Sequence, residues 1–165
     1  MSAALENALP SRSELEVVER IGHSLNMNSL DMDLRTSLSR PIVLVVDDSV
    51  DNLVLLEYQL TRLTECAVVT AETGEAAVHL AQHNQPSLIL LDILLPDING
   101  IEVIQRLRQA PSTAGIPIVA LTALARTEDR DRILDSGCDD YLAKPYDLDE
   151  LQAVVNRHLP QCCRL

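Results

Sequence analysis

The segment LILLDILLPDING (residues 88–100) decides the fold of this chain. It opens with four consecutive apolar residues, 88–91, and leads into a turn that contains proline and glycine. A short uninterrupted apolar run bounded by turn residues is typical of a strand buried on both faces of a parallel sheet. Because the run stops at Asp92, the predicted strand carries a carboxylate at its carboxyl end.

Working outward from this segment, short apolar runs alternate with segments of helical periodicity from residue 42 onward. The alternation predicts an α/β fold, a doubly wound five-stranded parallel sheet with helices on both faces. Thr73 and Asp147, the latter followed by Glu150, are predicted N-cap residues, and Gly137 is predicted to end a helix. The predicted strands are 42–46, 67–71, 88–91, 117–121 and 140–142, and the predicted helices are 51–63, 74–83, 100–109, 127–136 and 147–159.

Three aspartates lie at the carboxyl ends of two predicted strands. Asp47 and Asp48 follow the first strand, and Asp92 follows the third. Ligand sites of doubly wound sheets lie at this edge, so we expect the three carboxylates to converge. Like charges this close repel unless a cation lies among them, and all-oxygen ligands favour Mg²⁺ or Mn²⁺. A divalent metal site is the interpretation, while any one of these aspartates taken alone is as well explained by a helix cap or a solvated rim.

A hydroxyl and an ammonium group accompany the carboxylates. Thr122 ends the fourth strand, and Lys144, the only lysine of the chain, follows the fifth and precedes Pro145. A transferring phosphoryl group carries its charge on the equatorial oxygens, which a hydroxyl, an ammonium and a metal ion can neutralise. The set of residues therefore predicts acceptance of a phosphoryl group.

Residues 42–159 resemble the receiver domain of two-component response regulators, a flavodoxin-like fold with strand order 2-1-3-4-5. The matching motifs are the acidic pair in LVVDDS, the acceptor in LILLDILLPDINGIEV, the threonine in IVALTA and the lysine in DDYLAKPY. Each motif is weak alone, but the four in this order and on these strand ends are highly specific. Pro96 and Gly100 match the turn that follows the acceptor in this family.

The resemblance implies a role for each site residue. Asp92 is the nucleophile that attacks a phosphohistidine donor, and Thr122 and Lys144 each contact a phosphoryl oxygen. Asp48 binds Mg²⁺ directly and Asp47 mostly through water, with Asp92 and the backbone carbonyl of Leu94 completing the protein ligands. The peptide bond between Lys144 and Pro145 is expected to be cis.

Switching is implied by Thr122 and Tyr141. Movement of Thr122 to the phosphoryl group opens space for the Tyr141 ring to turn inward, which changes the face formed by the fourth helix, fifth strand and fifth helix. A plain alternative is that Tyr141 packs the edge of the sheet. Leu94 and Leu124, two positions beyond Asp92 and Thr122, border the path of the hydrolytic water, so we expect slow self-dephosphorylation.

The implied partners are a histidine kinase or histidine phosphotransfer protein as donor and a target protein that reads the phosphorylated face. The protein is expected to turn over no external substrate. An alternative is a phosphorylation-independent adaptor, although such proteins usually lack the acceptor aspartate or the lysine. A phosphatase of the haloacid-dehalogenase type needs Asp-x-Asp at the acceptor strand, whereas Ile93 and Leu94 follow Asp92.

Composition restricts the compartment and the partners. The formal net charge of −12 disfavours direct nucleic-acid binding, and only 2% of the residues are aromatic, so platforms for base stacking are absent. No apolar run is long enough to span a bilayer, and residues 1–10 lack the pattern of a signal peptide. We expect a cytoplasmic protein without membrane insertion.

Three parts are predicted: an N-terminal extension (1–40), a receiver domain (41–160) and a tail (161–165). In the extension, Ser11 begins a short amphipathic helix with Leu15, Val18, Ile21 and Leu25 on one side. The extension is interpreted either as a flexible arm or as a docking or dimerisation helix, and the last of these would make a homodimer. Because the chain stops at Leu165, shortly after the last predicted helix, a stand-alone receiver without an output domain is expected.

Overall fold

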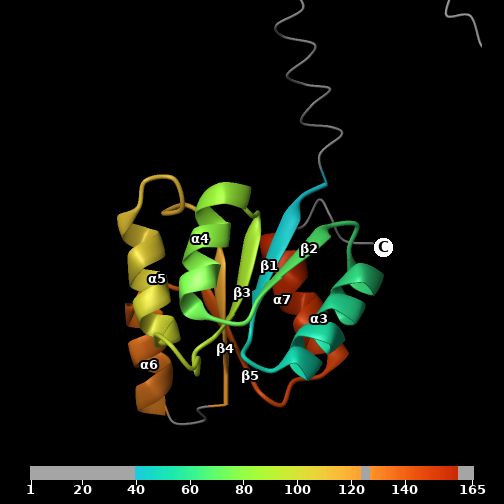
Figure 1. Cartoon of the computed structure of the whole chain (residues 1–165). Helices are drawn as coiled ribbons and strands as arrows, with labels where there is room; N and C mark the ends of the chain where they lie inside the picture. Colours follow the sequence, from blue (N-terminus) through green and yellow to red (C-terminus); the bar gives the residue numbers. More distant parts are fainter. Residues whose placement is uncertain (1–39, 124–126, 160–165) are drawn as a thin grey trace, which may run out of the picture. The chain divides into compact units, whose positions relative to one another are not determined.

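The computed structural model describes residues 40–123 and 127–159, so the helix predicted from Ser11 lies outside the described residues. Five parallel strands form one sheet in the order β2-β1-β3-β4-β5, as the resemblance implied (Figure 1). The strands are β1 (Ile42–Val46), β2 (Ala67–Ala71), β3 (Leu88–Asp92), β4 (Ile118–Thr122) and β5 (Asp140–Ala143). The helices are α3 (Val50–Leu63), α4 (Gly74–Asn84), α5 (Gly100–Gln109), α6 (Thr127–Asp135) and α7 (Leu148–His158).

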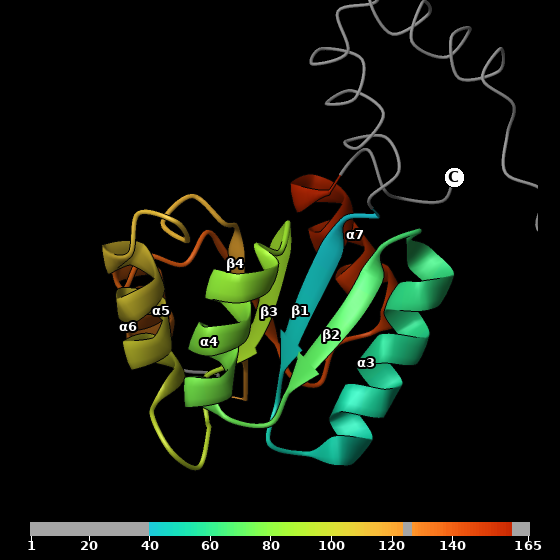
Figure 2. The ribbon, with the colours of Figure 1, turned by 45° about the horizontal axis from the view of Figure 1, so that its top comes forward.

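Helices cover both faces of the sheet. Figure 2 shows α3 and α7 on one side and α4, α5 and α6 on the other. Alternate residues of β1 point to opposite sides, so that Val43 and Val45 pack with α3 and α7, whereas Leu44 and Val46 pack with α4 and α5. The apolar residues of β3 and β4 are buried, which explains why these strands have no polar alternation in the sequence.

The register of the two central strands determines where their polar ends lie. β1 pairs with β3 through Val46 opposite Leu91, so Asp47 and Asp92 follow directly from paired residues. The chain order reverses between these strands, because β2 lies on the far side of β1 and β4 on the far side of β3. The site therefore lies at the topological switch point, where doubly wound sheets bind their ligands.

The predicted helix caps are confirmed. The Thr73 hydroxyl accepts a hydrogen bond from the amide of Ala76, and Asp147 and Glu150 form a reciprocal capping box at the start of α7. Gly137, after α6, has a φ of 103°, which only glycine adopts without strain. Element ends differ from the prediction by one residue at most, and no helix of the described part of the chain is long and apolar enough to cross a membrane.

Candidate functional site

Three carboxylates converge at the carboxyl end of the sheet, as predicted. Asp47, directly after β1, is fully buried. Asp92 at the end of β3 is 7% exposed, and Asp48 is exposed. One oxygen of each carboxylate lies within 4.8 Å of one oxygen of the other two. Three like charges are thus held together at one point of the fold.

Lys144, which follows the edge strand β5, pairs with two of the carboxylates. Its Nζ atom donates to Asp47 Oδ2 and to Asp92 Oδ2, each at 2.6 Å. The lysine follows β5, and its backbone amide donates to the carbonyl of Thr122 at 2.7 Å, which extends the β4–β5 pairing past the strand end. The Lys144–Pro145 peptide bond is cis, as expected.

Asp47 has further donors that the sequence reasoning missed. Its Oδ1 accepts from the amide of Ser49 at 2.9 Å and from Asn52 Nδ2 at 3.0 Å. Ser49 is also the N-cap of α3, so the first turn of that helix is built around the Asp47 carboxylate. An asparagine five residues after a strand-end aspartate, on the first turn of a predicted helix, was the available signal.

The electrostatic environments of the charged residues differ. Burial raises the pKa of Asp47, but hydrogen bonds from Lys144, the Ser49 amide and Asn52 outweigh burial, so its pKa lies below 3.8. For Asp92 burial prevails over the hydrogen bonds from Lys144 and Leu94, and its pKa lies above 3.8. Burial lowers the pKa of Lys144, but its two carboxylate partners outweigh that effect and raise it. Asp92 is therefore the more basic of the two buried carboxylates.

The loop after Asp92 is closed by hydrogen bonds from two backbone amides. The amide of Gly100 donates to the carbonyl of Ile93 at 3.0 Å, and the amide of Leu94 donates to Asp92 Oδ1 at 2.8 Å. A Cβ atom at Gly100 would lie 2.7 Å from the carbonyl oxygen of Asp92, so only glycine fits there. The Leu94 side chain is 53% exposed beside the acceptor.

The two predicted switch residues lie on adjacent strands. Thr122 is buried at the end of β4, and Tyr141 on β5 is partly buried against the cluster formed with α4, α5 and α6. The guanidinium carbon of Arg130, on α6, lies 4.5 Å from the centroid of the Tyr141 ring. Leu124 lies outside the described residues, so the structure does not address its predicted place beside the hydrolytic water.

The residues present fit a divalent cation. The carboxylate site, defined as Asp47, Asp48, Asp92 and Lys144, combines three negative charges with one positive charge. Its donor atoms are all oxygens, which Mg²⁺ prefers, and the exposed Asp48 leaves one side open to water. Lys144 alone leaves a surplus of negative charge, which a metal ion would balance.

Residues 43–156 match the family described as the response regulator receiver domain. The chain belongs to this family. Receivers are the phosphoryl-accepting domains of two-component signalling. The predicted fold and family are thus confirmed.

Curated relatives of this receiver include transcriptional regulators. The DNA-binding dual master transcriptional regulator RpaA of Synechocystis is 39% identical over 127 residues, which cover 76% of this chain and 52% of RpaA. The transcriptional regulatory protein PrrA of Mycobacterium tuberculosis is 42% identical over 120 residues, 73% of this chain and 50% of PrrA. The chain thus spans about half the length of these relatives.

Solved receiver structures share the fold over their full length. The receiver domain of the sensor histidine kinase PA1611 from Pseudomonas aeruginosa, with magnesium in its active-site cleft, is 32% identical with a TM-score of 0.68, covering 74% of this chain and 100% of that one. The Vibrio cholerae chemotaxis protein CheY4 is 26% identical with a TM-score of 0.68, covering 73% and 100%.

Proposed function

We propose that this receiver accepts a phosphoryl group from a phosphohistidine onto Asp92 in a Mg²⁺-dependent reaction, and signals through a protein-binding face that responds to phosphorylation. The observation that carries the proposal is the position of Lys144, whose ammonium group bridges Asp92 and Asp47 within the carboxylate site. This arrangement places a fixed positive charge beside the nucleophile, where phosphoryl oxygens develop negative charge.

The transfer breaks one bond and forms one. An Asp92 carboxylate oxygen forms the new bond to phosphorus as the bond between phosphorus and the imidazole nitrogen of the donor breaks, and the imidazole leaves with the electron pair. Lys144 moves its hydrogen bond from Asp92 to a phosphoryl oxygen, while its bond to Asp47 keeps the ammonium group in place. Thr122 contacts a second phosphoryl oxygen from the end of β4.

Asp48, Asp92 and the backbone carbonyl of Leu94 would hold the Mg²⁺ ion, with Asp47 acting mostly through water. This division agrees with the hydrogen bonds, because Asp47 is already engaged by Lys144, Ser49 and Asn52. The bound ion supplies neutralisation of the charge on the phosphoryl oxygens. Mn²⁺ has no support beyond its similar ligand preference.

The surroundings of the site favour a protein as donor. Exposed apolar residues follow one face of α3 next to the site, with Val50, Val54 and Tyr58 at helical spacing of four. Beside them lies a pocket of about 440 Å³ lined by Asn52, Leu55, Gln59, Ala123, Lys144, Pro145 and Tyr146. A histidine kinase or phosphotransfer protein that presents its phosphohistidine on a helix matches such a surface.

Output is assigned to the face formed by α6, β5 and α7. The partly buried ring of Tyr141 and the guanidinium of Arg130 above it form a contact that an inward rotation of the ring would break. We further propose that the protein turns over no external substrate and acts in the cytoplasm. We also propose that a target protein binds this face, and that dimerisation is a mode of output.

The intact mass of the protein after incubation with Mg²⁺ and acetyl phosphate tests the proposal. We expect one added phosphoryl group in the wild-type protein, none in Asp92→Asn and none when Mg²⁺ is chelated. Phosphorylation of Asp92→Asn to the same extent would exclude Asp92 as the acceptor. Absence of phosphorylation in folded wild-type protein would favour the adaptor alternative.

A further inference from the structure

The loop between β3 and α5, residues 93–99, is held at two places. Its base is closed where Gly100 bonds the carbonyl of Ile93. Its tip is held by Asp97, whose two carboxylate oxygens accept hydrogen bonds from the amides of Gly74 and Glu75, each at 2.9 Å. Leu94, whose carbonyl is a proposed metal ligand, lies between these two attachments.

The Asp97 contact links two segments that are more than twenty residues apart in the sequence. Gly74 and Glu75 begin α4, and amides in the first turn of a helix have no partner within the helix. The bonds to these two amides lower the pKa of Asp97 to about 2, so the carboxylate is ionised throughout the neutral range. Asp97 of the loop thus caps α4, although it lies outside that helix in the sequence.

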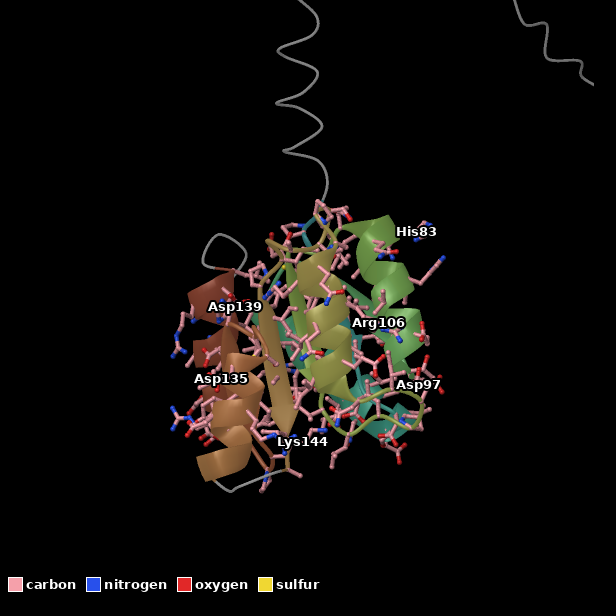
Figure 3. The ribbon with its side chains drawn as sticks, turned by 90° about the vertical axis from the view of Figure 1, so that its left-hand side faces the viewer. His83, Asp97, Arg106, Asp135, Asp139 and Lys144 are labelled. Atoms are coloured by element: carbon pink, nitrogen blue, oxygen red, sulfur yellow. The ribbon has the colours of Figure 1, made fainter. Side chains whose placement is uncertain are left out.

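Packing under the contact is equally close. A Cβ atom on Gly74 would lie 2.5 Å from Ile98 Cγ1 and 2.8 Å from Val103 Cγ2, so glycine is needed for the start of α4 to approach the loop. Glu75 also pairs with Arg106 of α5 at 2.7 Å. Figure 3 shows Asp97 and Arg106 on the side of the molecule where α4 and α5 lie together. The loop, α4 and α5 therefore pack as one unit.

We propose that Asp97 is a positioning residue for the metal: by bonding the start of α4, it holds the loop that carries Leu94 in the conformation that Mg²⁺ binding requires. The inference rests on the proposed function, which assigns the ion to Asp48, Asp92 and Leu94. A loop that is ordered before binding loses less conformational freedom when the ion binds. Groups that orient metal ligands from outside the ligand set commonly change metal affinity by about ten- to a hundredfold.

The test is a Mg²⁺ titration of the full chain followed by ¹H–¹⁵N spectra, with hydrogen exchange of the Gly74 and Glu75 amides measured on the same samples. We expect Asp97→Ala to raise the dissociation constant for Mg²⁺ on the order of tenfold, the lower end of that range. Asp97→Asn, which keeps one acceptor oxygen, should restore part of the affinity and serves if the alanine variant folds poorly.

Thr73→Ala is the matched control. The Thr73 hydroxyl caps the same helix through Ala76 of that helix, not through the loop, so its loss should lower the thermal midpoint and leave Mg²⁺ affinity unchanged. The inference is overturned if Asp97→Ala exposes the two amides to exchange and yet binds Mg²⁺ as the wild type does. Failure of the wild-type protein to bind Mg²⁺ would instead remove the proposed function, and the inference with it.

Discussion

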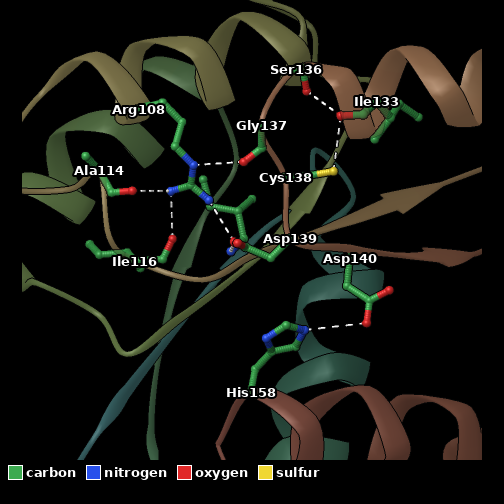
Figure 4. A network of polar contacts seen from close by, with 11 residues as sticks. Arg108, Ala114, Ile116, Ile133, Ser136, Gly137, Cys138, Asp139, Asp140 and His158 are labelled. Atoms are coloured by element: carbon green, nitrogen blue, oxygen red, sulfur yellow. Dashed lines mark hydrogen bonds and ion pairs between the residues drawn. The ribbon is translucent and has the colours of Figure 1, made fainter.

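The two ends of the sheet differ in how their charged groups are paired. At the amino end of β4 and β5, Arg108 lies among acceptors from two separate segments, those that precede β4 and β5 (Figure 4). Its Nε donates to the carbonyl of Gly137, Nη1 to those of Ala114 and Ile116, and Nη2 to the carboxylate of Asp139, at 2.7–3.0 Å. These five residues form the arginine clamp, in which one positive charge meets one negative charge.

The carboxylate site at the other end of the same strands has a charge surplus. Its three carboxylates face one ammonium group, which pairs with two of them, and burial raises the pKa of Asp92. Figure 3 shows Asp139 of the clamp and Lys144 of the site at opposite ends of the β-sheet. The clamp is complete without a ligand, whereas the carboxylate site needs a cation.

The arginine clamp serves the stability of the fold, whereas the carboxylate site serves its function. Groups whose hydrogen bonds are all satisfied lower the free energy of the folded state. Crowded like charges raise that free energy, but they are what the reaction at the site requires. Substitutions in the clamp should therefore reduce stability and spare phosphorylation. Substitution of Asp92 in the carboxylate site should abolish phosphorylation and spare, or even increase, stability.

The largest expected effect is that of Arg108→Ala. The substitution removes the donor of three carbonyl groups and one donor of the Asp139 carboxylate, which keeps its bond from the amide of Ile118, so we expect a loss of about 3 kcal/mol in the free energy of unfolding. Urea denaturation measures the loss, and Arg108→Lys should lose less because it keeps the charge. Phosphoryl uptake by the folded variant should match the wild type. An Arg108→Ala variant of unchanged stability that takes up no phosphoryl group would contradict the assignment of the clamp to stability.

Metal binding gives the next effect. Mg²⁺ at about a hundred times its dissociation constant should raise the free energy of unfolding by about 2.7 kcal/mol, because only the folded state assembles the site. Thermal unfolding with Mg²⁺ and with a chelator measures the difference. Asp48→Asn should reduce it, and Arg108→Lys should keep it in full. An equal gain in the Asp48 variant would mean that the ion acts elsewhere.

A smaller effect of opposite sign is expected for Asp92→Asn without metal. Folding disfavours the ionised form of Asp92, so an uncharged residue of the same shape should stabilise the protein by about 1–2 kcal/mol near neutral pH. The gain should shrink as the pH falls through the folded-state pKa, because wild-type Asp92 then becomes protonated as well. Denaturation in a chelating buffer checks this, and a destabilised variant would contradict a charge surplus at the site.

Much of this organisation could be predicted from the sequence because it is local or periodic. Apolar runs locate the strands, and residues that directly follow them, such as Asp47, Asp92 and Lys144, must lie at one edge of a parallel sheet. The first turn after β1 was predicted less well. α3 begins at Val50, one residue earlier than predicted, and the bond from Asn52 in its first turn to Asp47 was not predicted.

Contacts between distant segments could not be predicted in this way. Asp97 meets Gly74 across 23 residues and Arg108 meets Asp139 across 31, and neither pair belongs to a motif or a periodic pattern. The predicted end of α4 was also one residue too early. Its cap, Gln85, adopts the left-handed conformation at φ 47°, and because this position is usually a glycine, the sequence carried no signal for it. Such contacts depend on how the layers pack, which single-sequence patterns do not encode.

The smallest effect is a pH dependence at Asp97. Its pKa is about 2 in the folded protein against 3.8 ordinarily, so its stabilising bonds to α4 are fully present above pH 3.8 and are lost as the pH falls toward 2. Asp97→Asn should be less stable than the wild type at neutral pH, and the gap should close in that window. Urea denaturation across an acid series measures the gap.

Two variants make this acid series decisive. Thr73→Ala caps the same helix less well, but a hydroxyl does not titrate there, so its deficit should not change with pH. Asp92→Asn should differ from the wild type with the opposite sign, since its charge opposes folding where that of Asp97 supports it. If the Asp97 deficit persisted unchanged at pH 2, its bonds to α4 would not depend on the carboxylate charge, and the contact would be one of packing through Ile98 and Gly74 alone.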